Sequence, residues 1–432
     1  MREMKDSGIA WIGEIPKNWD IQKIKYNFCI ISGSTPSSSI SNYWDGDVIW
    51  VTPADFKTDD HWVYKGKRNI TQSGLKSCNT TIIPEGSIVF SKRAPIGSVV
   101  INKVPLCTNQ GCLCCIHKEG GCTNFFYYTM SVFTEQFEII SAGTTFKEIS
   151  LNSFSNFKVP IPSLEEQQKI ADFLDAKCGE IDGILGDIEA QTETLEAYKR
   201  SVITEAVTKG LHPDAEMKDS GIAWIGEIPT DWGIIKVKYT SSIIRGGSPR
   251  PINEYLSESD DGYNWIRIGD TKKHSKYIEA TKLKITKAGL SSTRLVEEDT
   301  LLLTNSMSYG EPYILKIKGC IHDGWLAFFD YKGIDKAFLY YVLLSSCTRT
   351  QFSISVSGSV VVNLNIEKVK NTYIALPSLT EQQEIADFLD VKCGEIDALI
   401  AGKKEQAETL RAYKKSLIFE YVTGKKEVPR YE

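Results

Sequence analysis

A cluster of thiols around residue 115 has the most obvious capacity for chemistry in this chain. The cluster, which could bind a metal ion, consists of Cys107, Cys112, Cys114, Cys115, His117 and Cys122. Zinc prefers such ligands, but the spacing C-x-C-C is not that of a zinc knuckle. The run L-C-T-N-Q-G-C-L-C-C-I is also typical of a buried strand, where a free cysteine behaves as a small apolar side chain. We therefore expect a buried strand and no metal site.

No catalytic constellation emerges from the rest of the chain. The sequence has neither a phosphate-binding G-x-x-x-x-G-K-[ST] loop nor a G-x-S-x-G nucleophile elbow. An N-P-P-Y-like methyltransferase tetrapeptide is also missing. The histidines are scattered without metal-ligand spacing, at His61, His117, His212, His274 and His322. These observations favour recognition of a ligand over catalysis.

The composition predicts a cytoplasmic protein of two or more domains. A chain of 432 residues exceeds the usual size of one domain. No apolar run approaches the ~20 residues needed to cross a bilayer, and the charged start of the chain lacks the apolar core of a signal peptide. Eleven cysteines without an export signal indicate free thiols rather than disulfides.

Charge is distributed unevenly along the chain. Taken over the whole chain, the net charge of −5 argues against nucleic acid as a partner. Residues 17–161 nevertheless carry 14 basic and 11 acidic side chains, and residues 230–376 carry 19 and 15. Residues 162–212 carry 5 basic against 11 acidic side chains, and residues 377–424 carry 6 against 9. The modest basic excess of two blocks fits either nucleic-acid binding or an ordinary solvated surface.

The chain is an internal repeat. Residues 3–16, E-M-K-D-S-G-I-A-W-I-G-E-I-P, recur unchanged at 216–229, and P-S-L-x-E-Q-Q-x-I-A-D-F-L-D occurs at both Pro162 and Pro377. Such self-similarity indicates two units of one design. We expect four segments: a domain over 1–161, a helical region over 162–212, a second domain over 213–376, and a second helical region with a tail over 377–432.

Each glutamine-rich motif begins a predicted long helix. Ser163 with Glu166, and Ser378 with Glu381, have the S-x-x-E spacing of a capping box. Apolar residues then recur at steps of three and four, the pattern of a coiled-coil seam. The seam residues are Ile170, Leu174, Ile181, Leu185, Ile188, Leu195 and Val202 in the first copy, and Ile385, Leu389, Ile396, Ile400, Leu410 and Leu417 in the second.

Glycines inside these helices leave their continuity open. They are Gly179, Gly183 and Gly186 in the first copy and Gly394 and Gly402 in the second. Each costs about 1 kcal/mol in a helix, so they could mark a close approach of two helices or a break. A helix without a break would be roughly 65–70 Å long.

The blocks between the helices are predicted to be strand-rich α+β domains. Runs such as D-V-I-W-V-T-P from Asp47 and L-V-E-E-D-T-L-L-L-T-N from Leu295 combine β-branched and aromatic residues with turn residues. Each block also has one predicted short helix, at 125–140 and 336–352. The fold class is therefore α+β, with two strand-rich domains separated by two long helices and related by a pseudo-two-fold repeat.

The order of these motifs resembles the DNA-specificity subunit of type I restriction–modification systems over essentially the whole chain. The doubled E-Q-Q-x-I-A-D-F-L-D helix start after a strand that ends in proline is the most specific part. The resemblance implies two target recognition domains, helices packed as an antiparallel coiled coil, and no catalysis by this chain. It implies double-stranded DNA, two methyltransferase subunits and, for cleavage, a translocating nuclease subunit as partners. S-adenosylmethionine would be bound by the methyltransferase subunits.

Candidate base-reading residues lie in turns that carry hydrogen-bond donors. Arginine can address guanine, and asparagine or glutamine can address adenine, through paired hydrogen bonds. The candidates are Ser34, Thr35, Lys92, Arg93, Asn109, Gln110, Gly143 and Thr144 in the first domain, and Arg245, Ser248, Arg250, Asn305, Ser306, His322 and Ser359 in the second. Acidic helix residues such as Asp175 and Asp182 fit either a solvated face or contact with methyltransferase subunits.

Two related units joined head to tail close into a pseudo-two-fold object only if their helices pair antiparallel. Two diverged domains on such a frame predict an asymmetric bipartite target, with helix length setting the unread spacer. A fused restriction or modification enzyme with unrecognised motifs is one alternative, and methyl transfer by the isolated chain would favour it. A protein-only coiled-coil scaffold is another, and salt-sensitive DNA binding would argue against it.

Overall fold

The computed structural model describes residues 2–57, 60–118, 120–141, 147–272, 275–306, 309–356 and 363–429. The chain forms two compact units: unit 1 is Met1–Asp187 with Gln406–Glu432, and unit 2 is Ile188–Glu405. Each unit therefore combines one strand-rich domain with part of both long helices. The helical regions predicted over 162–212 and 377–432 are accordingly divided between the two units. Along the described stretches, no helix has the length and apolarity needed to cross a membrane.

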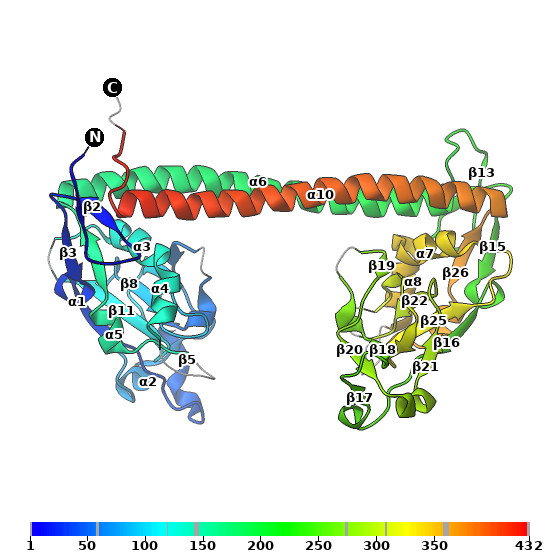
Figure 1. Ribbon diagram of the computed structural model, residues 1–432, viewed down its shortest axis with the longest axis horizontal. Helices are drawn as coiled ribbons and strands as arrows, with labels where there is room; N and C mark the ends of the chain where they lie inside the picture. Colours follow the sequence, from blue (N-terminus) through cyan, green and yellow to red (C-terminus); the bar gives the residue numbers. More distant parts are fainter. Residues whose placement is uncertain are drawn as a thin grey trace. The chain divides into compact units, whose positions relative to one another are not determined.

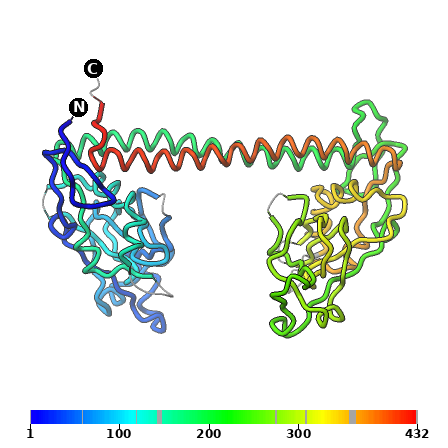
Figure 2. The backbone as a smooth tube through the Cα atoms, in the orientation of Figure 1, coloured from blue at the N-terminus to red at the C-terminus, as the bar shows by residue number. Residues whose placement is uncertain are grey.

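The two long helices are continuous. Helix α6 spans Leu164–Lys209 and helix α10 spans Leu379–Val422 (Figure 2). A Cβ atom added at any of the five helical glycines would meet nothing within 4 Å. Neither expectation for these glycines is therefore right: they mark no break and no close helix–helix approach. Helix α6 is followed by Gly210, whose φ of +76° is the left-handed conformation that glycine adopts most easily after a helix.

The helices pair antiparallel in both units, as predicted. In unit 1, Lys414 near the end of α10 donates to Asp182 in the first half of α6 at 2.7 Å. In unit 2, Lys199 in the second half of α6 donates to Asp397 in the first half of α10, also at 2.7 Å. Early residues of each helix thus meet late residues of the other. The two ion pairs correspond under the internal repeat.

The predicted seam residues lie on the inner faces of these helices. Those that the structure places in buried positions are Ile170, Leu174, Ile181, Ile188, Ile385, Leu389, Ile396, Ile400 and Leu417, while Leu185, Leu195, Val202 and Leu410 are half-buried. Towards the end of α6 the buried stripe moves to Ile203, Ala206 and Val207. A straight helix has 3.6 residues per turn, so its apolar face drifts from a strict 3.5-residue pattern.

Each long helix begins with a serine cap and a carboxylate that binds a distant tryptophan. Ser163 Oγ accepts from the Glu166 amide at 3.3 Å, as a capping box requires. The Glu166 carboxylate accepts instead from the Trp19 indole N–H at 2.9 Å. Glu381 and Trp232 repeat this bond at 3.0 Å. The carboxylate expected to complete each capping box therefore ties the beginning of a domain to its helix.

The glutamine after that carboxylate is buried and holds the domain from a second side. In unit 1, Gln167 donates to the Pro162 carbonyl at 3.0 Å and accepts from the Cys122 amide at 3.2 Å. In unit 2, Gln382 accepts from the Asp335 amide at 2.7 Å and donates to the Pro377 carbonyl at 2.9 Å.

An aspartate about two turns further along each helix completes the attachment. Asp175 accepts from the Tyr128 hydroxyl at 2.6 Å, and Asp390 accepts from the Tyr341 hydroxyl. Asp175 and Asp182 are thus engaged within unit 1 rather than simply solvated. The side chains of the repeated motif at these positions therefore attach each domain to its helix.

The domain of unit 1 is coloured from blue to cyan in Figure 1, where β8 and β11 are labelled. It is built on a five-stranded sheet of order β4-β11-β8-β9-β7. Its neighbours pair antiparallel except β9 and β7, which are parallel. The strands of this unit are β1 (Met4–Asp6), β2 (Glu14–Pro16), β3 (Asp20–Lys23), β4 (Phe28–Ser32), β5 (Trp44–Val48), β6 (Trp50–Val51), β7 (Trp62–Val63), β8 (Ile88–Ser91), β9 (Val99–Asn102), β10 (Cys107–Thr108), β11 (Cys112–His117) and β12 (Lys158–Ile161). Its shorter helices are α1 (Ile24–Asn27), η1 (Ser41–Tyr43), η2 (Pro53–Asp55), α2 (Gln72–Lys76), α3 (Thr123–Val132), α4 (Thr134–Ile139) and α5 (Leu151–Ser155).

The domain of unit 2 repeats this sheet, in the order β16-β25-β22-β23-β19, with the same strand directions. A second sheet has the order β17-β20-β18-β24-β21. The strands are β13 (Met217–Asp219), β14 (Glu227–Pro229), β15 (Gly233–Lys236), β16 (Ser242–Arg245), β17 (Leu256–Ser257), β18 (Tyr263–Ile266), β19 (Tyr277–Ile278), β20 (Leu283–Ile285), β21 (Arg294–Val296), β22 (Leu301–Thr304), β23 (Pro312–Leu315), β24 (Gly319–Ile321), β25 (Trp325–Phe329) and β26 (Tyr373–Leu376). The shorter helices are η3 (Val237–Tyr239), η4 (Ile252–Glu254), η5 (Ile268–Asp270), η6 (Lys287–Ser292), α7 (Lys336–Leu344), α8 (Ser346–Val356) and α9 (Ile366–Lys370).

The α+β fold class is confirmed, and the two domains are more alike than their sequences indicate. The helix predicted over 125–140 is two helices, α3 and α4, and that predicted over 336–352 is α7 and α8. In both units the strand after the repeated tryptophan pairs antiparallel with the strand before the long helix, as β3 with β12 and β15 with β26. Diverged side chains therefore lie on one shared framework.

Replacing Gly179 with alanine is expected to raise the free energy of unfolding by about 1 kcal/mol. The residue is inside α6 with open space around its Cα, and alanine orders a helix at a lower entropic cost than glycine. Thermal unfolding of the two proteins measures the difference.

Gly424→Ala serves as the opposite case. This glycine has a φ of +69°, and an added Cβ would lie 2.4 Å from Pro16 Cδ. We expect a lower melting temperature here. Equal destabilisation by both substitutions would contradict a continuous helix through Gly179.

Candidate functional site

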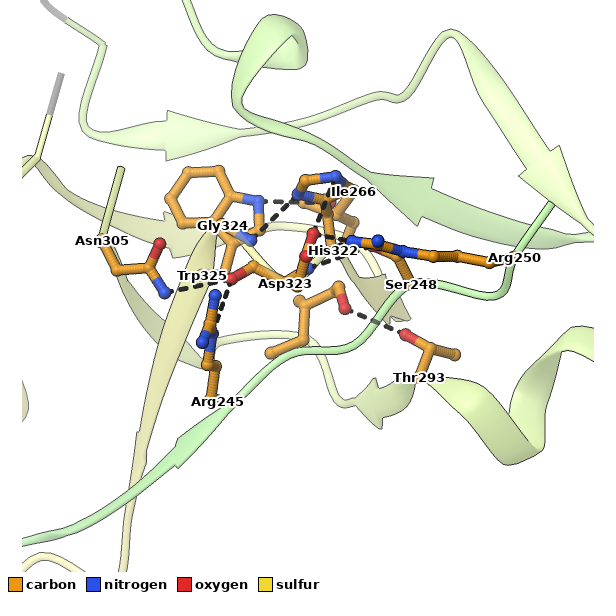
Figure 3. A network of polar contacts seen from close by, with 11 residues as sticks. Arg245, Ser248, Arg250, Ile266, Thr293, Asn305, His322, Asp323, Gly324 and Trp325 are labelled. Atoms are coloured by element: carbon orange, nitrogen blue, oxygen red, sulfur yellow. Dashed lines mark hydrogen bonds and ion pairs between the residues drawn. The ribbon is translucent and has the colours of Figure 1, made fainter. Parts of the chain in front are cut away.

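Three loops of unit 2 converge on Asp323, which lies in the turn between β24 and β25 (Figure 3). The Ser248 hydroxyl donates to Asp323 Oδ1 at 2.8 Å, and His322 Nε2 lies 2.9 Å from the same oxygen. An Arg250 terminal nitrogen lies 3.4 Å from Oδ2. These contacts bring together residues from the loop after β16 and the turn before β25.

The main chain of Asp323 is held as firmly as its side chain. Arg245 Nε donates to the Asp323 carbonyl at 3.0 Å, and Asn305 Nδ2 donates to the same oxygen at 3.0 Å. Five residues proposed from the sequence, Arg245, Ser248, Arg250, Asn305 and His322, therefore surround one aspartate. The network joins the ends of β16, β22 and β24, which come from both five-stranded sheets.

The protonation states in this network follow from its hydrogen bonds. The Gly324 amide donates to His322 Nδ1 at 2.9 Å, so Nε2 carries the proton that points at Asp323. Burial lowers the pKa of His322 below its ordinary value. Burial also opposes ionisation of Asp323, but the Ser248 hydrogen bond, His322 and the nearby arginines outweigh it and hold the pKa of Asp323 below its usual range. At neutral pH the centre is an aspartate next to a neutral imidazole.

A cavity of about 420 Å³ opens beside this network. Its lining includes the buried Trp265 ring, Arg250 and Arg267 together with His322 and Asp323. The Arg250 side chain is 81% exposed. Cationic groups, a carboxylate and an aromatic ring thus share one open surface, which could bind a polar planar group.

In unit 1, loops also meet at the corresponding turn, which is formed by Asn109, Gln110 and Gly111. The Thr35 hydroxyl donates to the Gln110 side-chain oxygen, and the Gly111 amide donates to Asn109 Oδ1 at 2.8 Å. The Lys92 amide donates to the Gly111 carbonyl at 2.9 Å, which brings in the end of β8. Ser34 is on the same loop, and its amide donates to the Thr108 carbonyl at 2.9 Å.

Several sequence candidates have surroundings that do not favour base reading. Asn305 is 1% exposed and supports the Asp323 turn, so its amide cannot reach a ligand in this conformation. Lys92 Nζ is paired with Glu148 at 2.7 Å, and Arg93 lies 3.7 Å from the same carboxylate. Ser306 is half-buried beside Asn305. Gly143, Thr144 and Ser359 lie outside the residues that the structure describes.

The cysteine-rich run forms the short strand β10, the turn after it and the strand β11. The side chains of Cys107, Cys112, Cys114 and Cys115 are buried, and burial raises the pKa of Cys107 to about 12 and that of Cys114 to about 11. His117 packs its ring 4.2 Å from Phe28. Within the described ranges, no group of three or more possible ligands is placed to hold a metal ion.

The family model described as the type I restriction modification DNA specificity domain matches the chain twice, at residues 16–186 and 229–409. The chain belongs to this family. The MjaIX specificity subunit of a type I restriction enzyme from Methanocaldococcus jannaschii is 32% identical over 85% of this chain and 84% of its own length. The MjaVIII specificity subunit from the same organism is 27% identical over 70% and 69% of the respective chains.

A solved structure from work on complex assembly and conformational transition of the type I R-M system has a similar fold. Its TM-score is 0.69, with 15% identity over 94% of this chain and 98% of that one. This likeness concerns the fold alone. Each family match contains one strand-rich domain and the beginning of the helix that follows it, so the family unit occurs twice.

Sequence reasoning missed the two charged residues that shape the site in this family member. Asp323 has no signal in the sequence, because an acidic side chain is not a hydrogen-bond donor to DNA. Arg267, which lines the cavity with Nη2 3.6 Å from Asp270 Oδ1, was hidden in the strand-like run N-W-I-R-I-G-D. Its place at the end of a strand, before a Gly-Asp turn, is the signal that could have identified it.

Acidification is expected to destabilise the protein through His117. Burial lowers the pKa of His117 from 6.5 to about 4 in the folded protein, so the unfolded chain takes up this proton first as pH falls. The stability that His117 contributes is complete above pH 6.5 and is lost between about pH 6.5 and 4. Melting temperatures measured across this range should fall less steeply for His117→Phe than for the wild type.

His212→Gln is the control, because His212 is exposed. We expect its melting profile to follow the wild type. Parallel profiles for wild type and His117→Phe would contradict a buried neutral imidazole at residue 117.

Proposed function

We propose that this chain is the DNA-specificity subunit of a type I restriction–modification complex, with each strand-rich domain reading one half of an asymmetric bipartite target. The observation that carries the proposal is the duplicated three-loop site. Both domains hold the corresponding turns with corresponding backbone bonds but display different side chains. A repeated framework with diverged surface groups is suited to reading two different short sequences.

The electrostatics of the site are compatible with a nucleic-acid partner. Arg245 and Arg250 are exposed at the rim, where guanidinium groups can bind phosphates or guanine edges. The basic excess of each domain is small, so we expect the subunit to bind DNA more tightly within a complex than alone.

In this proposal the chain itself is not catalytic. Its named relatives are specificity subunits, and its sequence has no recognisable methyl-transfer motif. Two methyltransferase subunits would dock on the helical regions and bind S-adenosylmethionine, and a translocating nuclease subunit would join for cleavage. The complex would work on DNA in the cytoplasm.

The test is to express the chain with a methyltransferase subunit in a host without adenine methylation and to sequence the methylome. The expected result is one motif with two unlike halves around a fixed unread spacer. Binding of that duplex by the complex should weaken as salt rises, because phosphate contacts release counterions. Methylation by the isolated chain would favour the enzyme alternative, and no DNA binding by the complex would favour the scaffold.

Lengthening both helices by one heptad is expected to lengthen the spacer by about three base pairs. Seven residues inserted after Asp187 in α6 and after Glu405 in α10 keep the seam in phase, because seven is two turns of the 3.5-residue repeat. Each helix grows by about 10 Å, and base pairs are stacked about 3.4 Å apart. The methylome of the variant measures the new spacing.

The matched control inserts seven residues between Pro213 and Asp214, outside both helices. This insertion should leave the spacer unchanged. An unaltered spacer in the helix variant, with methylation retained, would refute the idea that helix length sets the spacing.

A further inference from the structure

The turn before the second strand of the five-stranded sheet, β11 in unit 1 and β25 in unit 2, is built in the same way in both domains. Gly111 donates its amide to Asn109 Oδ1 at 2.8 Å, and Gly324 donates its amide to His322 Nδ1 at 2.9 Å. The next loop is tied by the Lys92 amide to Gly111 in one domain and by the Asn305 amide to Gly324 in the other, each at 2.9 Å. Residues 110 and 323 therefore occupy equivalent positions.

A side-chain hydrogen bond from the neighbouring loop reaches both equivalent positions. In unit 1 the Thr35 hydroxyl donates to Gln110, and in unit 2 the Ser248 hydroxyl donates to Asp323 at 2.8 Å. A neutral amide and a carboxylate thus close the same turn. Because the turn forms with either group, the negative charge of Asp323 is not required by the framework.

The charges around the two positions have diverged together. The residue that ends the first sheet strand is Ser32 in unit 1 and Arg245 in unit 2, as the pairing of each with Leu113 and Leu326 shows. The residue whose backbone amide donates to the aspartate of the next short helix, Asp55 or Asp270, is Thr52 in one domain and Arg267 in the other. Unit 2 has charged groups where unit 1 has neutral hydroxyls.

The polar atoms of these side chains that remain available for hydrogen bonds indicate which groups each side chain can bind. Asp323 Oδ1 is occupied by Ser248 and His322, whereas Oδ2 has only the long 3.4 Å contact with the exposed Arg250. Arg245 uses Nε to hold the Asp323 carbonyl, so its terminal nitrogens are not used in this bond, and the residue is exposed. Gln110 is exposed, and the Thr35 bond leaves its amide nitrogen to donate.

Resting on the proposed function, we infer that residues 110 and 323 are equivalent specificity-determining positions, with different base chemistry. Gln110 addresses adenine, because an amide can donate to N7 and accept from the N6 amino group. Asp323 and Arg245 address a G·C pair, since a carboxylate accepts from cytosine N4 and a guanidinium donates to guanine O6 and N7. The half-site of unit 2 therefore contains a G·C pair that the half-site of unit 1 lacks at the equivalent place.

The experiment exchanges the hydrogen-bonded pair Thr35–Gln110 of unit 1 with the pair Ser248–Asp323 of unit 2. The variant Ser248→Thr/Asp323→Gln gives unit 2 the threonine–glutamine pair of unit 1, and Thr35→Ser/Gln110→Asp makes the reverse exchange. Each variant is expressed with the methyltransferase subunit, and the methylated motifs are sequenced. We expect each variant to change one base pair in one half of the motif, with the other half retained.

Arg245→Ser provides a second measurement, because it copies Ser32 and leaves the Asp323 side-chain bonds in place. Binding of the assembled complex to the wild-type target, and to a target with that G·C pair changed to A·T, should show discrimination reduced by about 10-fold or more. Asp231→Gln is the matched control, since this exposed residue precedes the repeated Trp232. We expect it to retain the wild-type motif.

Three outcomes would overturn the inference. The exchanged variants could methylate the wild-type motif, alter both halves, or lose all methylation while still folding and assembling, which would make Asp323 a support of the turn only. Failure of the proposed function looks different: the wild-type complex itself would then show no bipartite motif.

Discussion

A buried glutamine at the start of each long helix fixes where a domain sits on that helix. Gln167 and Gln382 bond both to the proline that precedes the helix and to a main-chain amide of the domain. A buried amide left without partners costs about 1–3 kcal/mol, so each glutamine selects one arrangement of domain and helix. The adjacent Trp–Glu bond and the Tyr–Asp bond restrict the remaining freedom. These contacts therefore determine where the loops of each domain lie relative to its helix.

The same contacts explain why the glutamine-rich motif could be recognised in the sequence whereas its purpose could not. The motif is local, repeated, and followed by a regular apolar period, so helix position and seam were predictable from spacing. Antiparallel pairing followed from the internal repeat and the family resemblance. The partners are not local: Trp19 lies 147 residues from Glu166. The capping-box pattern therefore identified the helix start correctly but assigned the carboxylate to the wrong partner.

The candidate site was predictable in parts for a related reason. Turn residues with donors, such as Ser248, Arg250 and His322, could be selected by type, and the structure brings them together. Asp323 could not, because its importance comes from three loops that meet only after the sheet has formed. Asn305 illustrates the opposite error, since its type suits adenine but its amide is buried under the turn. Helical glycines misled in the same way, because open space around a residue is a tertiary property.

The way the recognition turn is stabilised allows its surface chemistry to change without changing the fold. Its backbone is held by amide–carbonyl bonds and by a side-chain acceptor of the residue before position 110 or 323, which is Asn109 Oδ1 or His322 Nδ1. The residue at position 110 or 323 needs only one acceptor for a neighbouring hydroxyl, a condition that glutamine and aspartate both meet. Substitution at this position then alters the donor and acceptor pattern on the surface while the hydrogen bond from the neighbouring hydroxyl is kept. Because stability and recognition depend on different atoms of the same turn, the two domains can diverge in what they read on one shared framework.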